Sequence, residues 1–130
     1  MTEADRQLLF DLRKNLLHLH KTLLDWERSA YERVHGRVSS SELLKVIVED
    51  PQFGWLRPIS ELIVRIDEAV DMESPDHQAD VDALLARARA VTAADETGTP
   101  HAQRYHTALQ EHPDAVFAHR AVTNVLKTRR

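Results

Sequence analysis

The chain has 130 residues, of which 42% are apolar and 29% charged, and its formal net charge is −4 with neutral histidines. These proportions are typical of a folded protein, and the length predicts one domain spanning residues 1–130. Cysteine is absent, which excludes disulfides, thiolate zinc sites, iron–sulfur clusters and cysteine nucleophiles.

The first predicted helix covers residues 3–35. Thr2 and Asp5 have the spacing of a capping box, and Gly36 suits the C-terminal end. Apolar residues recur at alternating spacings of three and four, as in the seam of a helical bundle. The seam consists of Leu9, Leu12, Leu16, Leu19, Leu23, Trp26 and Ala30, and a second row beside it of Phe10, Leu17, Leu24 and Tyr31. So wide an apolar stripe must pack against at least two other helices.

The second predicted helix covers residues 41–49. Ser39 precedes Glu42 by three residues, a spacing that allows a cap at the helix start. The run Leu43–Val48 is apolar nearly all round, and periodicity alone does not separate a strand from a buried helix over so short a run. The cap and the absence of a partner strand favour a helix. Asp50-Pro51 then ends it, and a small aromatic corner follows at residues 53–55.

Proline marks the starts of three further predicted helices. A helix over residues 55–72 keeps the three-four apolar spacing, with Pro58 in or near its first turn. Ser74-Pro75 and Thr99-Pro100 each predict a capping residue followed by the first residue of a new helix. The last segment carries Pro113, which is expected to kink it or to divide it in two.

Four long rods with short connections predict an all-α fold, an up-and-down four-helix bundle. The second rod is expected to combine residues 41–49 with residues 55–72 and to be broken near Asp50–Gly54. The last rod is expected to be kinked near Pro113.

The segment Phe53-Gly54-Trp55-Leu56-Arg57-Pro58-Ile59-Ser60, continuing to Ile66-Asp67, resembles one found in small bacterial helical proteins of no known activity. The resemblance covers mainly this stretch. It implies a bacterial helical bundle and brings no ligand or catalytic residue with it.

A metal site is one hypothesis, because bundle cores can hold metals between inward-facing side chains and the chain has eight histidines. No two histidines are three or four residues apart, so no pair on one helix has the spacing to hold the same ion. His20 and Glu27 fall inside the leucine stripe, and Asp67 lies at the edge of a later apolar face, so these three are the candidates for a divalent metal or small ligand. The alternative is structural, because a buried glutamate needs a salt bridge or hydrogen bond and such a pair would fix the helix register. His106, His112 and His119 are further possible partners.

A weaker hypothesis is a ribonuclease. Arg13 and His18 match the Arg-x4-His spacing of the motif in HEPN-type helical bundles, and this resemblance would imply an RNA-cleaving centre there. On a straight helix the two positions diverge by about 140°, so two unrelated surface residues are the alternative.

The leading hypothesis is a cytoplasmic, non-enzymatic protein without a cofactor that contacts a protein partner, either another copy of itself or another protein. The apolar residues exceed what a small bundle can cover, and dimerisation is the commonest remedy. No membrane partner is expected, because no apolar run approaches roughly 20 residues. The basic tail at residues 127–130 is too small a footprint to predict nucleic-acid binding. The interface candidates are Leu43, Leu44, Ile47, Phe53 and Trp55.

Overall fold

The computed structural model describes residues 2–71 and 77–128. Over these residues the chain is all-helical and has no strand, which confirms the predicted fold class. In chain order the elements are α1 (Glu3–His35), α2 (Ser40–Glu49), the 3₁₀ helix η1 (Pro51–Leu56), α3 (Arg57–Asp71), α4 (His77–Val91), α5 (Pro100–Glu111) and α6 (Pro113–Lys127). The predicted helix end at Met72 and the predicted start at Ser74-Pro75 lie outside the described residues.

The predicted caps are present. Thr2 Oγ1 accepts a hydrogen bond from the Asp5 N–H at 3.0 Å, and the Asp5 carboxylate accepts one from the Thr2 N–H, which completes the capping box. Ser39 Oγ accepts from the Glu42 N–H at 3.2 Å and Thr99 Oγ1 from the Ala102 N–H at 3.1 Å. Gly36 follows α1 with φ +84°, a left-handed conformation that glycine adopts without steric cost.

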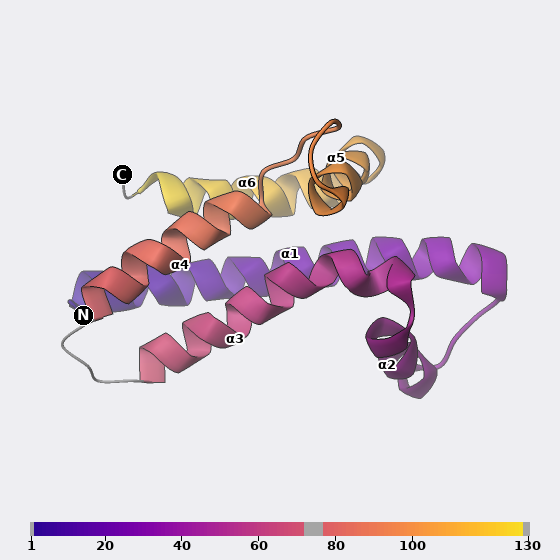
Figure 1. Cartoon of the computed structure of the whole chain (residues 1–130), viewed down its shortest axis with the longest axis horizontal. Helices are drawn as coiled ribbons and strands as arrows, with labels where there is room; N and C mark the ends of the chain where they lie inside the picture. Colours follow the sequence, from indigo (N-terminus) through magenta and orange to yellow (C-terminus); the bar gives the residue numbers. More distant parts are fainter. Residues whose placement is uncertain (1, 72–76, 129–130) are drawn as a thin grey trace.

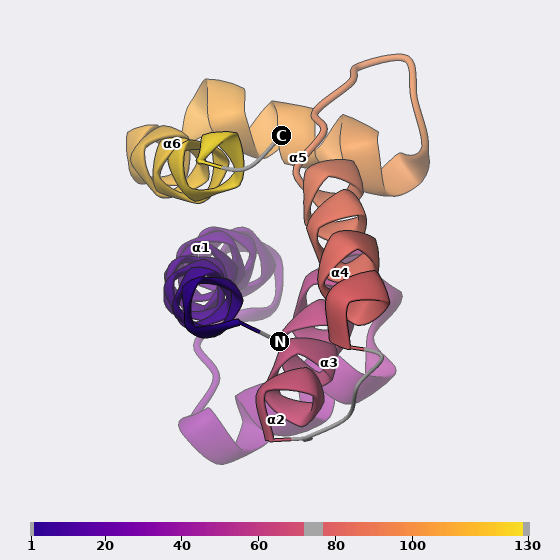
Figure 2. The ribbon, with the colours of Figure 1, turned by 90° about the vertical axis from the view of Figure 1, so that its left-hand side faces the viewer.

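The long helix α1 runs the length of the molecule, and α3 and α6 pack along it (Figure 1). The helix α4 contacts both α3 and α6, so these four helices surround a common core. In Figure 1, α1 and α4 run in one direction and α3 and α6 run back. Figure 2 looks along α1 and α6 and shows α3 and α4 inclined beside them.

The core contains the predicted seam of α1. Its five leucines are fully buried, namely Leu9, Leu12, Leu16, Leu19 and Leu23. The second row is covered less completely than its width predicts, because Phe10 stays 47% exposed and Leu17 40% exposed.

The predicted second rod is not one rod. The chain does break at Asp50, where η1 begins, but α2 lies apart from the other helices and is not in line with α3 (Figure 1). Its main contact is with η1. The change of direction follows from Pro51, which cannot continue a helix and keeps Asp50 extended at φ −86°, ψ 126°.

Pro113 divides the last segment instead of kinking it. His112 has φ −126° and ψ 100°, outside the helical region, as is usual for a residue before proline. Figure 1 shows α5 nearly end-on and α6 lengthwise, so the chain turns sharply between them. None of the described helices is long and apolar enough to cross a membrane.

Candidate functional site

Glu27 is the centre of a polar cluster between α1, η1 and α5. Its side chain is 1% exposed and forms a two-point ion pair with Arg104, with Nη2–Oε2 and Nε–Oε1 distances of 2.7 and 3.1 Å. Trp55 Nε1 donates to Oε1 at 2.8 Å, and Gln52 Nε2 donates to Oε2 at 3.3 Å. The carboxylate thus accepts four hydrogen bonds from its own chain, which uses its lone pairs fully.

Aromatic rings extend this cluster. The Arg104 guanidinium lies 4.2 Å from the centre of the Trp26 ring, and Trp26 meets Trp55 edge to face. His101 lies beside Trp55, with Nδ1 2.6 Å from the Trp55 carbonyl oxygen and Nε2 2.8 Å from that of Val91. These contacts fix η1 between α1 and α5. The cluster corresponds to the structural alternative for Glu27, a buried salt bridge.

Asp67 of α3 forms an ion pair with Arg13 of α1. Arg13 and Glu27 are fourteen positions apart on α1, about 21 Å along the helix axis. His20 lies between them and contributes to a third place, a pocket near α2. The structure therefore does not bring His20, Glu27 and Asp67 together. Within residues 2–71 and 77–128, no three His, Asp or Glu side chains are grouped so that they could hold a metal ion.

Arg13 and His18 also lie apart. While Arg13 contacts α3 through Asp67, His18 lines a groove of about 480 Å³ together with His112 and Phe117. The two side chains thus contribute to different surfaces of α1, as the divergence of their helix positions predicts.

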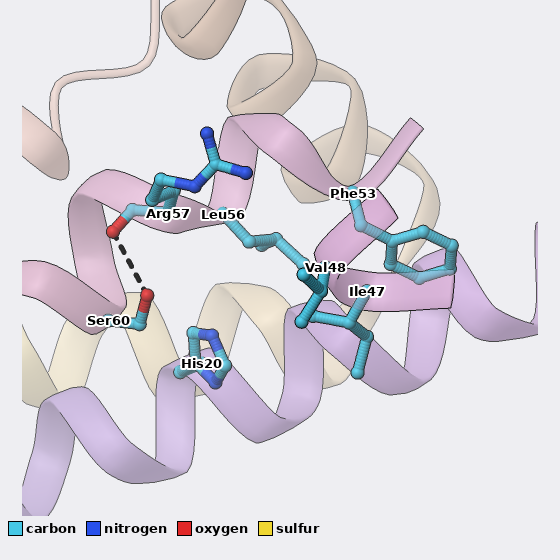
Figure 3. Close-up of a pocket in the computed structure, with 7 residues that line it drawn as sticks. All are labelled: His20, Ile47, Val48, Phe53, Leu56, Arg57 and Ser60. Atoms are coloured by element: carbon cyan, nitrogen blue, oxygen red, sulfur yellow. Dashed lines mark hydrogen bonds between the residues drawn. The ribbon is translucent and has the colours of Figure 1, made fainter. Parts of the chain in front are cut away.

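The pocket near α2 has a volume of about 220 Å³ and is open to solvent on one side (Figure 3). Its walls are mostly apolar and come from α1, α2, η1 and α3. The lining residues are His20, Ile47, Val48, Phe53, Leu56, Arg57 and Ser60. Figure 3 shows the His20 ring and the Ser60 hydroxyl on the same side of the pocket, whereas the Arg57 guanidinium points away from His20.

The polar groups of this pocket differ in their hydrogen bonds. Ser60 Oγ donates to the Arg57 carbonyl oxygen at 3.0 Å. None of the described residues forms a hydrogen bond with the His20 ring. Burial lowers the pKa of His20 below 6.5, which favours the neutral imidazole. The charged residue of the lining is Arg57, whose guanidinium points away from His20 (Figure 3).

Two apolar residues of α2 are exposed among polar ones. Leu44 is 68% exposed and Val48 73% exposed, and α2 has no buried residue. Leu43 and Ile47 are half-buried. Of the interface candidates, Leu44 is thus the most exposed.

The other two interface candidates face the interior. Phe53 is 2% exposed and belongs to the core, and Trp55 is held by Glu27. Aromatic residues before a helix commonly anchor its start on the core, and that is what this corner does.

Sequence reasoning missed Arg104, Ser60 and Val48. Arg104 is 77 positions from Glu27, and no local pattern joins the two. Val48 offered a signal, because it lies four residues after Leu44 and so shares its helix face.

Comparisons with known proteins do not assign this chain to a family. No family model matches it, and neither does any curated protein or solved structure.

Proposed function

We propose that the protein acts by self-association, in which α2 packs against α2 of a second copy. One observation carries this proposal: Leu44 and Val48 of α2 are 68% and 73% exposed, whereas its other apolar residues, Leu43, Val46 and Ile47, pack against the core. A helix shorter than roughly 12 residues is marginal in water unless its apolar face is covered. A partner that covers Leu44 and Val48 would stabilise α2.

An antiparallel pairing of two α2 helices suits the side chains. With the two-fold axis level with residue 46, Leu44 of one copy lies opposite Val48 of the other. Lys45 and Glu49, both exposed, then approach the oppositely charged residue of the other copy. Each contact occurs twice by symmetry, as in a self-complementary interface.

In this proposal α1, α3, α4 and α6 form an up-and-down four-helix bundle that carries α2 at its side. Two ten-residue helices cover little surface, and small interfaces give weak complexes. We therefore expect a dissociation constant in the micromolar range.

Sedimentation velocity from about 1 to about 200 µM tests the proposal, since this range spans weak association. The informative variant combines Leu44→Lys with Val48→Lys, which places like charges opposite each other. The matched control is Phe117→Lys, because Phe117 is also exposed, at 67%, but lies on α6.

The wild type and the control should associate with rising concentration, and the double variant should stay monomeric with unchanged helix content. A wild type that is monomeric throughout, or a double variant that associates as the wild type does, would contradict the proposal.

A further inference from the structure

The pocket and the apolar surface of α2 share one residue. Val48 lines the pocket together with His20 and Ser60, and it is also the most exposed apolar residue of α2. Whatever covers Val48 therefore lies at the mouth of the pocket.

In the antiparallel pairing, the side chain opposite Val48 is Leu44 of the second copy. An apolar cavity of roughly 150 Å³ can accept benzene, which has more carbon atoms than the side chain of leucine. The pocket, at about 220 Å³, has room for Leu44. We infer that this pocket receives Leu44 of the second copy, so that self-association is a reciprocal insertion of one leucine into each partner. This inference rests on the proposed function.

The chemistry of the pocket suits an apolar side chain. Ile47, Val48, Phe53 and Leu56 supply apolar walls. Burial favours the neutral form of His20, and the Ser60 hydroxyl already donates within the chain. Covering His20 and Ser60 with a leucine therefore costs less than covering a charge, and the Arg57 guanidinium points away from His20 (Figure 3).

The apolar surface continues beyond the pocket along the line where α1 and α3 pack together. The helices α1 and α3 are antiparallel, and two pairs show which of their residues lie level with each other. Arg13 pairs with Asp67, and His20 shares the pocket with Ser60. Leu17 and Val64 fall between these two places, and they are 40% and 54% exposed. A second copy seated with Leu44 in the pocket would lie beside them, which enlarges the interface.

Mixed cysteine cross-linking tests this inference, and the chain suits it because it contains no cysteine. One protein carries Leu44→Cys, and it is mixed in turn with a second protein carrying Val48→Cys, Ser60→Cys or Glu61→Cys. The Val48 pair reports the pairing of α2 helices, and the Ser60 pair reports the pocket. Glu61 is the matched control, because it is adjacent in the sequence but exposed on another side of α3.

The inference predicts that the Ser60 heterodisulfide forms at a rate similar to the Val48 one and at least about tenfold faster than the Glu61 one. It also predicts that Leu44→Ala weakens self-association roughly tenfold to a hundredfold. If the Val48 pair forms but the Ser60 pair is no faster than the Glu61 pair, the inference is overturned and the proposed function stands. If the Val48 pair also fails and the wild type is monomeric, both are overturned.

Discussion

The helices α1 and α2 differ in a way that their composition does not predict. Leu, Val and Ile make up half of α2 and a smaller share of α1. Nevertheless, the five seam leucines of α1 are fully buried, whereas α2 buries no residue. The more apolar helix is the more exposed one.

The difference shows that burial depends on where the chain leads a helix as well as on its residues. The leucines of α1 share one face, and α3 and α6 lie along that face. The path of α2 is set by the turn at Asp50-Pro51 and by η1, which Glu27 holds through Gln52 and Trp55. As a result, Leu43, Val46 and Ile47 pack against the core, whereas Leu44 and Val48 stay exposed.

The largest expected effect is in the core of α1. Leu16→Ala should lower the free energy of unfolding by about 3 kcal/mol, because it leaves a cavity at a fully buried position. Leu44→Ala should change it by less than about 0.5 kcal/mol in dilute, monomeric protein. Urea unfolding at low micromolar concentration measures both free energies. Equal losses in the two variants would contradict the difference in burial between the helices.

The Glu27 cluster provides a second comparison, because it anchors η1, the element that α2 contacts. Glu27→Ala should cost about 2–3 kcal/mol, since it leaves Arg104, Trp55 and Gln52 without their acceptor. The matched control is Asp25→Ala, which removes only the exposed pair with Lys21 and should cost less than about 0.5 kcal/mol. A similar cost for the two variants in urea unfolding would show that the cluster does not anchor η1.

A smaller effect is expected at the cap of α2. Ser39→Ala removes the acceptor of the Glu42 N–H and should destabilise this helix by about 1 kcal/mol. Because α2 lies outside the core, the loss should appear as hydrogen exchange about fivefold faster in α2 than in the wild type. Ser41→Ala, in the same first turn, is the control and should leave the rates unchanged. Exchange of the α1 amides that becomes faster by the same factor would contradict the separation of the two helices.

The smallest expected effect concerns pH. Burial lowers the pKa of His20 on α1 and of His119 on α6 below 6.5. The unfolded chain therefore binds protons first as the pH falls, and the free energy of unfolding should decrease as the pH drops below about 6.5. Replacing both residues by glutamine should flatten this decrease in urea titrations between about pH 7.5 and pH 5.5. If the free energy of unfolding of the double variant falls with pH as steeply as that of the wild type, this prediction is wrong.

Much of the fold was predictable because its signals are local. The caps at Thr2, Ser39 and Thr99 and the turn at Asp50-Pro51 depend on residues within a few positions of one another. The spacing of the leucines likewise predicted the buried face of α1. The directions of α2 and α5 were not predictable in this way, because they depend on contacts between distant segments.

The candidate site was predicted only in part. The sequence indicated Leu44 as an interface residue and Glu27 as a buried charge that needs a partner. It did not indicate Arg104 as that partner, since a half-exposed arginine on a helix has no distinctive pattern. The pocket was not predictable either, because its walls come from four elements that only the tertiary fold brings together.

Hydrogen exchange of α2 as a function of protein concentration tests the central claim most directly, because it compares the same amides with and without a second copy. If α2 is covered by a second copy, its amides should exchange more slowly at 200 µM than at about 2 µM, while the core amides of α1 should not change. Exchange of α2 that is equally fast at both concentrations would contradict the account.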